Sequence, residues 1–148
     1  MLYIQSILSI ENELEIETTT KGAELTSIKY KGKEYLHDGK TYWNQSSPIL
    51  FPIVGKLRYN KARINEVEYP IPKHGFAMNM DFEKIDDHSY KLTSNEETLK
   101  QLPFNFELYI SYSTIKNKLI FNYTVINKES EKTMLFGIGG HPGFKCDY

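Results

Sequence analysis

The chain of 148 residues has the length of a single domain, and with 40% hydrophobic and 25% charged residues it is not a disordered protein. Its 18 basic and 19 acidic residues give a net charge of −1 and are dispersed, so we expect no nucleic-acid partner. No run approaches the roughly 18 apolar residues of a membrane helix, and the first residues lack the features of a signal peptide, so we expect no membrane association.

Strand patterns dominate the first third of the chain. Residues 14–17 and 25–30 are interpreted as strands, and Lys31-Gly32-Lys33 is typical of a turn after the second strand. The next segment, 43–58, is different, because its two prolines bracket an apolar run and cannot donate to a strand ladder. We expect an irregular stretch here that packs its apolar residues.

The last third predicts one short helix and a hairpin. Ser94-Asn95-Glu96-Glu97 has the spacing of a capping box, and Pro103 ends the helix that follows. Residues 106–112 and 119–125 alternate with a period of two and are joined by the turn-like 115–118, as expected of a hairpin. Residues 1–148 therefore predict one all-β unit, either a sandwich or a barrel.

Several kinds of chemistry have no support in the sequence. There is no G-x-S-x-G motif, and the glycine-rich residues 137–140 lack the G-K-[ST] ending of a phosphate loop. The four histidines show no metal-ligand spacing, and we expect neither a metal nor a cofactor. His37 and His88 are interpreted as solvated loop residues. The sole cysteine, Cys146, excludes an internal disulfide, and we expect a buried or inert thiol in a cytoplasmic protein.

The remaining two histidines, His74 and His141, share a distinctive context. Each lies next to a glycine and within three residues of a phenylalanine, in Lys73-His74-Gly75-Phe76-Ala77 and in Gly140-His141-Pro142-Gly143-Phe144. Two structural histidines and two imidazoles facing one pocket are both possible interpretations of this pattern.

The order of these motifs resembles the aldose 1-epimerase (galactose mutarotase-like) family, and in particular its bacterial branch of lactose-operon mutarotase-like proteins. The matching residues are Trp43, the run Pro48–Gly55, His74-Gly75-Phe76-Ala77, Val125-x-Asn127 and Gly140-His141-Pro142-x-Phe144. The resemblance covers essentially the whole chain. It implies a large antiparallel β-sandwich, of which this chain would be the N-terminal half, and the interconversion of the α and β anomers of aldoses.

The resemblance also implies roles for individual residues. His141 corresponds to the histidine that protonates the ring oxygen, and His74 to the histidine that holds and polarises the sugar. Arg58 is the best match to a sugar-binding arginine, and Lys56 competes with it for that role. Phe76 is expected to cover the apolar face of the sugar, whereas Trp43 is expected in the core. Met78 stands where relatives often have arginine.

The expected reaction explains the use of two histidines. Mutarotation removes the proton of the anomeric hydroxyl and protonates the ring oxygen as the ring opens, and imidazole, with a pKa near 6.5, suits the acid role. In the family the general base is a glutamate near the C-terminal end of chains about twice this long, and no glutamate here lies in that motif. A hexose or hexose derivative is the expected substrate.

The incomplete match to the family predicts an assembly and leaves alternatives open. Half of a sandwich exposes sheet edges and apolar faces, so we expect a homodimer that covers what the other half would cover. A catalytically inactive carbohydrate-binding module is the main alternative, because sugar binding alone needs no base. An interaction domain in which both histidines are structural is the third interpretation.

Overall fold

The computed structural model describes residues 13–146 of the chain. The named strand pairs are all antiparallel and form a four-stranded sheet in the order β10-β9-β8-β7, a three-stranded sheet in the order β1-β2-β3, and the pairs β11-β4 and β5-β6. The strands are β1 (Leu14–Thr18), β2 (Leu25–Tyr30), β3 (Lys33–Glu34), β4 (Ile49–Leu50), β5 (Lys61–Ile64), β6 (Val67–Pro70), β7 (Glu83–Asp86), β8 (Ser89–Thr93), β9 (Phe106–Ile115), β10 (Lys118–Asn127) and β11 (Gly139–Gly140).

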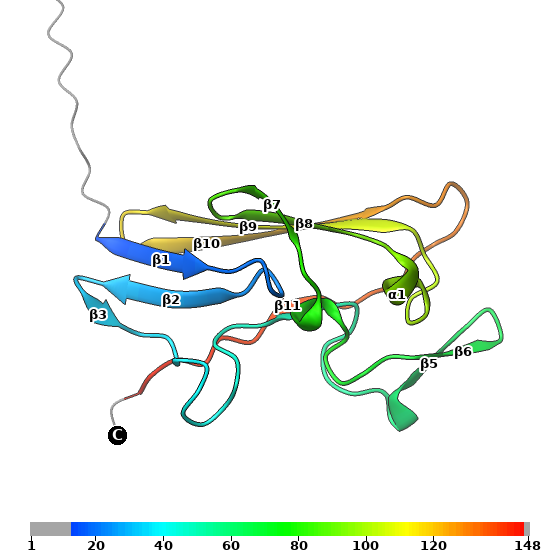
Figure 1. Ribbon diagram of the computed structural model, residues 1–148. Helices are drawn as coiled ribbons and strands as arrows, with labels where there is room; N and C mark the ends of the chain where they lie inside the picture. Colours follow the sequence, from blue (N-terminus) through cyan, green and yellow to red (C-terminus); the bar gives the residue numbers. More distant parts are fainter. Residues whose placement is uncertain (1–12, 147–148) are drawn as a thin grey trace, which may run out of the picture.

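The four-stranded and three-stranded sheets are the two layers of an antiparallel β-sandwich (Figure 1). On β9 the side chains of Phe106, Leu108, Ile110 and Tyr112 are buried, whereas those between them are partly exposed. This alternation places one face of β9 in the core and confirms the predicted hairpin of β9 and β10. The Tyr112 hydroxyl donates a buried 2.6 Å hydrogen bond to Ala23 O, which ties the larger sheet to the turn between β1 and β2.

The predicted helix exists, but it is shorter than expected and begins one residue later. The helix α1 (Glu96–Leu99) is capped by Asn95, whose side chain accepts hydrogen bonds from the backbone N–H groups of Glu97 and Thr98. Thr98 completes the capping box in place of the expected Glu97. Ser94 is not the cap, because its hydroxyl accepts a hydrogen bond from Phe106 N instead.

The segment 43–58 is irregular, as expected, except for the two residues of β4. Residues 46–52 are buried, and β4 pairs with β11, so Ile49 lies opposite Gly140 and Leu50 opposite Gly139. This pairing brings residues 139–140 next to residues 49–50, which are far away in the sequence. Two short 3₁₀ helices, η1 (Arg58–Asn60) and η2 (Ala77–Asn79), lie on either side of the β5-β6 hairpin in the sequence.

The β5-β6 hairpin projects away from the two layers, at the lower right of Figure 1.

Among the described residues, no helix has the length and apolar character needed to cross a membrane. The expectation of a buried thiol is wrong in one respect, since Cys146 is exposed.

Candidate functional site

The His74 motif is shaped by a close crossing of two backbone segments. Gly75 has φ +78°, and a Cβ at this position would lie 2.1 Å from Phe51 O, so only glycine fits here. Phe51 O in turn accepts hydrogen bonds from the N–H groups of Phe76 and Ala77, at 2.9 and 3.2 Å. This crossing fixes His74 beside the end of β4 and turns the Phe76 side chain into the core.

Two hydrogen bonds to one glycine orient the His74 side chain. His74 N donates to Gly55 O at 2.7 Å, and Gly55 N donates to His74 Nδ1 at 3.0 Å. Because a backbone N–H can only donate, Nδ1 is the acceptor, and Nε2 carries the proton of the neutral imidazole. Burial, followed by the nearby charges of Lys73 and His141, lowers the pKa of His74 below its ordinary value. His74 therefore presents an Nε2–H donor.

His141 follows β11 directly, and its position depends on the segment before β4. The His141 N–H donates to Pro48 O at 3.1 Å, and the Gly143 N–H donates to Ser46 O at 2.9 Å. These two bonds continue the β4-β11 pairing past the end of the strands. The side chain of His141 is exposed.

The structure brings both imidazoles and an indole into ring contact. The centroids of the His74 and His141 rings are 5.7 Å apart with an interplanar angle of 61°, and those of Trp43 and His141 are 5.2 Å apart with an angle of 64°. His141 therefore contacts both His74 and Trp43, each in an edge-on arrangement. We call these three residues the histidine site. The expectation of a core position for Trp43 is wrong, because its side chain is only partly buried.

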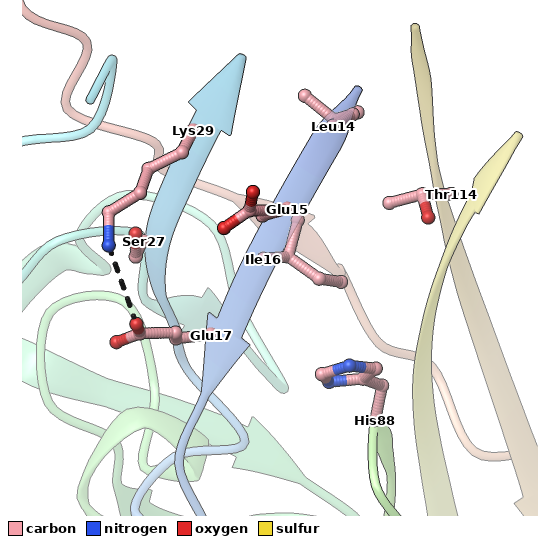
Figure 2. Close-up of a pocket in the computed structure, with 8 residues that line it drawn as sticks. All are labelled: Leu14, Glu15, Ile16, Glu17, Ser27, Lys29, His88 and Thr114. Carbon is pink, nitrogen blue, oxygen red and sulfur yellow. Dashed lines mark ion pairs between the residues drawn. The ribbon is translucent and has the colours of Figure 1, made fainter. Parts of the chain in front are cut away.

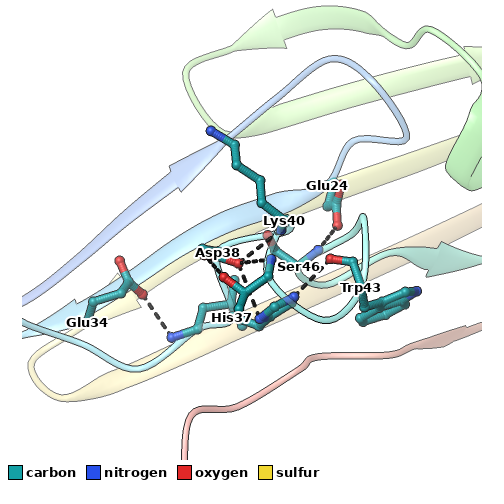
Figure 3. A network of polar contacts seen from close by, with 9 residues as sticks. Glu24, Glu34, His37, Asp38, Lys40, Trp43 and Ser46 are labelled. Atoms are coloured by element: carbon teal, nitrogen blue, oxygen red, sulfur yellow. Dashed lines mark hydrogen bonds and ion pairs between the residues drawn. The ribbon is translucent and has the colours of Figure 1, made fainter.

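His37 contacts Trp43 of the histidine site, and sequence reasoning missed this contact (Figure 3). Its Nε2 lies 2.9 Å from Trp43 O and must donate to it, and the two rings stack with an interplanar angle of 9°. Its Nδ1 lies 3.4 Å from Asp38 Oδ1, and hydrogen bonds from Thr41 and Lys40 lower the pKa of Asp38. His37 is thus a half-buried, bonded residue and not a solvated one. The turn-like sequence around it carried no signal of this contact.

The three expected sugar-binding residues are not gathered at the histidine site. Lys56 is exposed and follows Gly55, the partner of His74. Arg58 is exposed and lies over Tyr59, with 5.0 Å between Cζ and the ring centroid. The expected contact of Phe76 with a sugar is corrected by its burial, because its ring is 2% exposed and packs against Phe51 and Phe106. A ring with so little accessible surface packs the core and cannot cover a sugar.

Two cavities of the described surface contain a histidine, and they differ in their relation to the histidine site. One, of about 480 Å³, is lined by Trp43 together with His37, Tyr42, Gly143, Phe144, Lys145 and Cys146. The other, of about 440 Å³, lies along β1 and includes His88 and the Glu17–Lys29 ion pair of 3.7 Å (Figure 2). Only the first cavity shares a residue with the histidine site. His88 lies 3.1 Å from Thr18 Oγ1 and is half-buried, which also corrects its expected solvated position.

No group of three His, Cys, Asp or Glu side chains within residues 13–146 is arranged to hold a metal ion. The histidine site offers two imidazoles, of which His74 presents an Nε2–H donor and His141 an exposed ring. An antiparallel β-sandwich that brings two imidazoles into contact is the class of protein that these features define.

Comparison with known proteins identifies the family. Residues 6–148 match the model of the aldose 1-epimerase family, and the chain belongs to that family. It is 38% identical over 151 aligned residues to the plasmid form of protein LacX from Lactococcus lactis subsp. lactis, covering 94% of this chain and 50% of that protein. The chromosomal form of LacX is 37% identical with the same coverage.

Solved structures agree with this assignment. The galactose mutarotase related enzyme from Lactobacillus acidophilus superposes with a TM-score of 0.85 at 38% identity, over 93% of this chain and 48% of that one. A galactose mutarotase-like protein from Lactobacillus casei gives a TM-score of 0.83 at 37% identity, over 89% and 47% of the two chains. The chain thus spans about half the length of the relatives that it matches.

Proposed function

We propose that the protein is an aldose 1-epimerase-like isomerase that interconverts the α and β anomers of a hexose or hexose derivative. The observation that carries this proposal is the contact of 5.7 Å between the rings of His74 and His141, with Nδ1 of His74 already bonded to Gly55. Membership of the aldose 1-epimerase family supports the same conclusion. Both imidazoles are close enough to act on one pyranose.

In the proposed reaction the two histidines have different tasks. The Nε2–H of His74 donates a hydrogen bond to an oxygen of the sugar and orients it. His141, when protonated, gives its proton to the ring oxygen as the C1–O5 bond breaks, while a general base removes the proton of the anomeric hydroxyl. The resulting open chain has a carbonyl at C1. Rotation about C1–C2 and reversal of both proton transfers then yield the other anomer.

Other residues complete the proposed site. Arg58 and Lys56 have exposed cationic side chains that can donate to sugar hydroxyls if their flexible stems turn toward the ligand. The exposed edge of Trp43 offers an apolar surface next to His141. No glutamate of the sequence lies in the base motif of the family, so the role of general base is assigned to no residue here.

Polarimetry of freshly dissolved α-D-galactose and α-D-glucose tests the proposal. The chain should accelerate the change in rotation, and His141→Ala should reduce this acceleration by roughly 10²–10⁴-fold, the usual contribution of a positioned proton transfer. His88→Ala is the matched control, because it removes a half-buried histidine that is bonded to Thr18. Equal acceleration by the parent and His141→Ala chains would contradict the role of His141.

The second candidate is a carbohydrate-binding module without catalysis. It is favoured by the absence of a bonded carboxylate at the imidazoles of the described residues and by the half-length match to the relatives. Trp43 is the only tryptophan of the sequence and lies against His141, so its fluorescence reports directly on the site. A saturable change with sugar, without acceleration of mutarotation by the folded chain, identifies the binding module.

The proposal includes a homodimer and a cytoplasmic location. Large apolar side chains remain exposed on the described surface, among them Leu135, Phe136 and Phe144, and we propose that a second copy of the chain covers part of this surface. The free and exposed thiol of Cys146 suits a reducing compartment. We also treat residues 1–148 as one β-sandwich unit.

A further inference from the structure

The carboxylate of Glu24 is bonded to a segment far away in the sequence. Glu24 lies in the turn between β1 and β2, next to Ala23, whose carbonyl is bonded to the buried Tyr112 hydroxyl. Its Oε1 accepts hydrogen bonds from two successive backbone groups. One is Ser46 N at 2.5 Å (Figure 3) and the other is Ser47 N at 2.8 Å. Ser46 is 5% and Ser47 0% exposed, so both N–H groups belong to buried residues.

The other edge of the same segment carries the His141 motif. Ser46 O accepts the N–H of Gly143, and Pro48 O accepts the N–H of His141. The segment 46–48 is therefore held by Glu24 through its N–H groups and holds the His141 motif through its carbonyl groups. Because these two backbone hydrogen bonds join the segments, a shift of residues 46–48 either moves the backbone of His141 with them or breaks the bonds.

We propose that Glu24 is a positioning residue for His141, acting through the backbone of residues 46–48. A carboxylate suits this task, because charge-assisted hydrogen bonds are about twice as strong as neutral ones and one oxygen can serve both N–H groups. Loss of the carboxylate would leave two buried donors without a partner, which favours rearrangement of the segment. The catalytic consequence rests on the proposed function, but the structural link between Glu24 and His141 does not.

Three variants test this link. Glu24→Ala removes the acceptor, Glu24→Gln keeps one side-chain oxygen without the charge, and Glu129→Ala is the matched control. Glu129 Oε1 also accepts two hydrogen bonds, from Asn105 N at 2.7 Å and Asn105 Nδ2 at 2.8 Å, but it is bonded to no residue of the histidine site. The control thus removes a carboxylate with the same number of hydrogen bonds elsewhere in the fold.

The first readout is amide hydrogen exchange measured by NMR, together with the imidazole ¹⁵N shifts of His141. Glu24→Ala should speed exchange of the His141 and Gly143 amides by roughly ten- to hundredfold, the range set by loss of a charge-assisted hydrogen bond, and should shift the imidazole signals. Glu24→Gln should restore most of both. Unchanged exchange and unchanged His141 signals in Glu24→Ala, as in Glu129→Ala, would overturn the proposal.

The second readout is the polarimetric rate. Displacement of a catalytic group by about 1 Å can cost on the order of 10²-fold, so kcat should fall by roughly ten- to hundredfold in Glu24→Ala with a smaller change in KM. If the parent chain shows no acceleration, the proposed isomerase function fails, and the NMR readout alone decides the role of Glu24. If Glu24→Ala does not fold, Glu24→Asp replaces it, because its shorter side chain withdraws the acceptor while the charge stays. Parent-like exchange in that variant would overturn the proposal.

Discussion

The hydrogen bond of 3.0 Å between Gly55 N and His74 Nδ1 determines which nitrogen of this imidazole faces a ligand. It leaves Nε2–H as the only donor of the neutral ring. Protonation of Nδ1 would break the bond, and burial, Lys73 and His141 all disfavour that step by lowering the pKa of His74. The orienting role of His74 should therefore persist at pH values below the ordinary pKa of histidine.

We predict that His74 titrates with a midpoint below 6.5 and that removal of a neighbouring charge raises it. NMR titration of the imidazole ¹⁵N signals should show an upward shift in His141→Ala and in Lys73→Ala, and none in His88→Ala. Because the unfolded chain has the higher pKa, it takes up the proton first as the pH falls. Stability contributed by neutral His74 is thus present above pH 6.5 and is lost as the pH falls toward the folded pKa. A midpoint at or above 6.5 would contradict the prediction.

At the scale of elements, the crossing of Gly75 over the end of β4 determines where the His74 motif lies. We predict that Gly75→Ala is strongly destabilising, because the new Cβ would lie 2.1 Å from Phe51 O and the backbone has φ +78°. Gly32→Ala is the matched control, with φ +76° and no atom within 4 Å of its Cβ. The control should cost about 1–2 kcal/mol of unfolding free energy from backbone strain alone.

Urea denaturation of both variants separates steric overlap from strain. Gly75→Ala should lose at least about 2 kcal/mol more than Gly32→Ala, as expected when a buried backbone contact must open. It should also lose the ring contact of His74 with His141, because Gly75 adjoins His74. Equal losses in the two glycine variants would show that the crossing is easily displaced.

The elements that could be predicted from the sequence are those in which apolar and polar side chains alternate regularly. Alternating side chains reveal the hairpin of β9 and β10. One face of β9 is buried from Phe106 to Tyr112, and the positions of β10 alternate between partly exposed and exposed over much of its length. The pairing of β4 with β11 has no such signal, since a strand of two residues shows no periodicity. This limits prediction of the site, because that pairing brings His141 toward His74 and Trp43.

The same limit explains the individual errors at the site. His74 and His141 were identified from motifs, and the structure places their rings in contact. Phe76 and Trp43 exchange their expected places, because both lie on irregular backbone, where side-chain direction depends on the crossing of distant segments. His37 was missed for this reason too, since its partner Trp43 O is reached only after a loop.

At the scale of the whole molecule, the described surface has features of a protein with a partner. β10 has β9 on one side and no further strand of residues 13–146 on the other, so its outer backbone groups are open to pairing. Leu135 and Phe136, which follow β10, are 83% and 45% exposed. An open strand edge and exposed apolar side chains on one chain both favour association, and we propose that two copies pair across this edge with two-fold symmetry.

We predict that the chain sediments and scatters light as a dimer at micromolar concentration, and that Leu135→Lys shifts it toward the monomer. A charge at this exposed position costs little within one chain but must be desolvated in an apolar contact. Ile85→Lys is the control, because Ile85 is 52% exposed on β7, at the opposite edge of the four-stranded sheet. If both variants retain the dimer, the interface lies elsewhere. A parent chain that is monomeric throughout would contradict the homodimer itself.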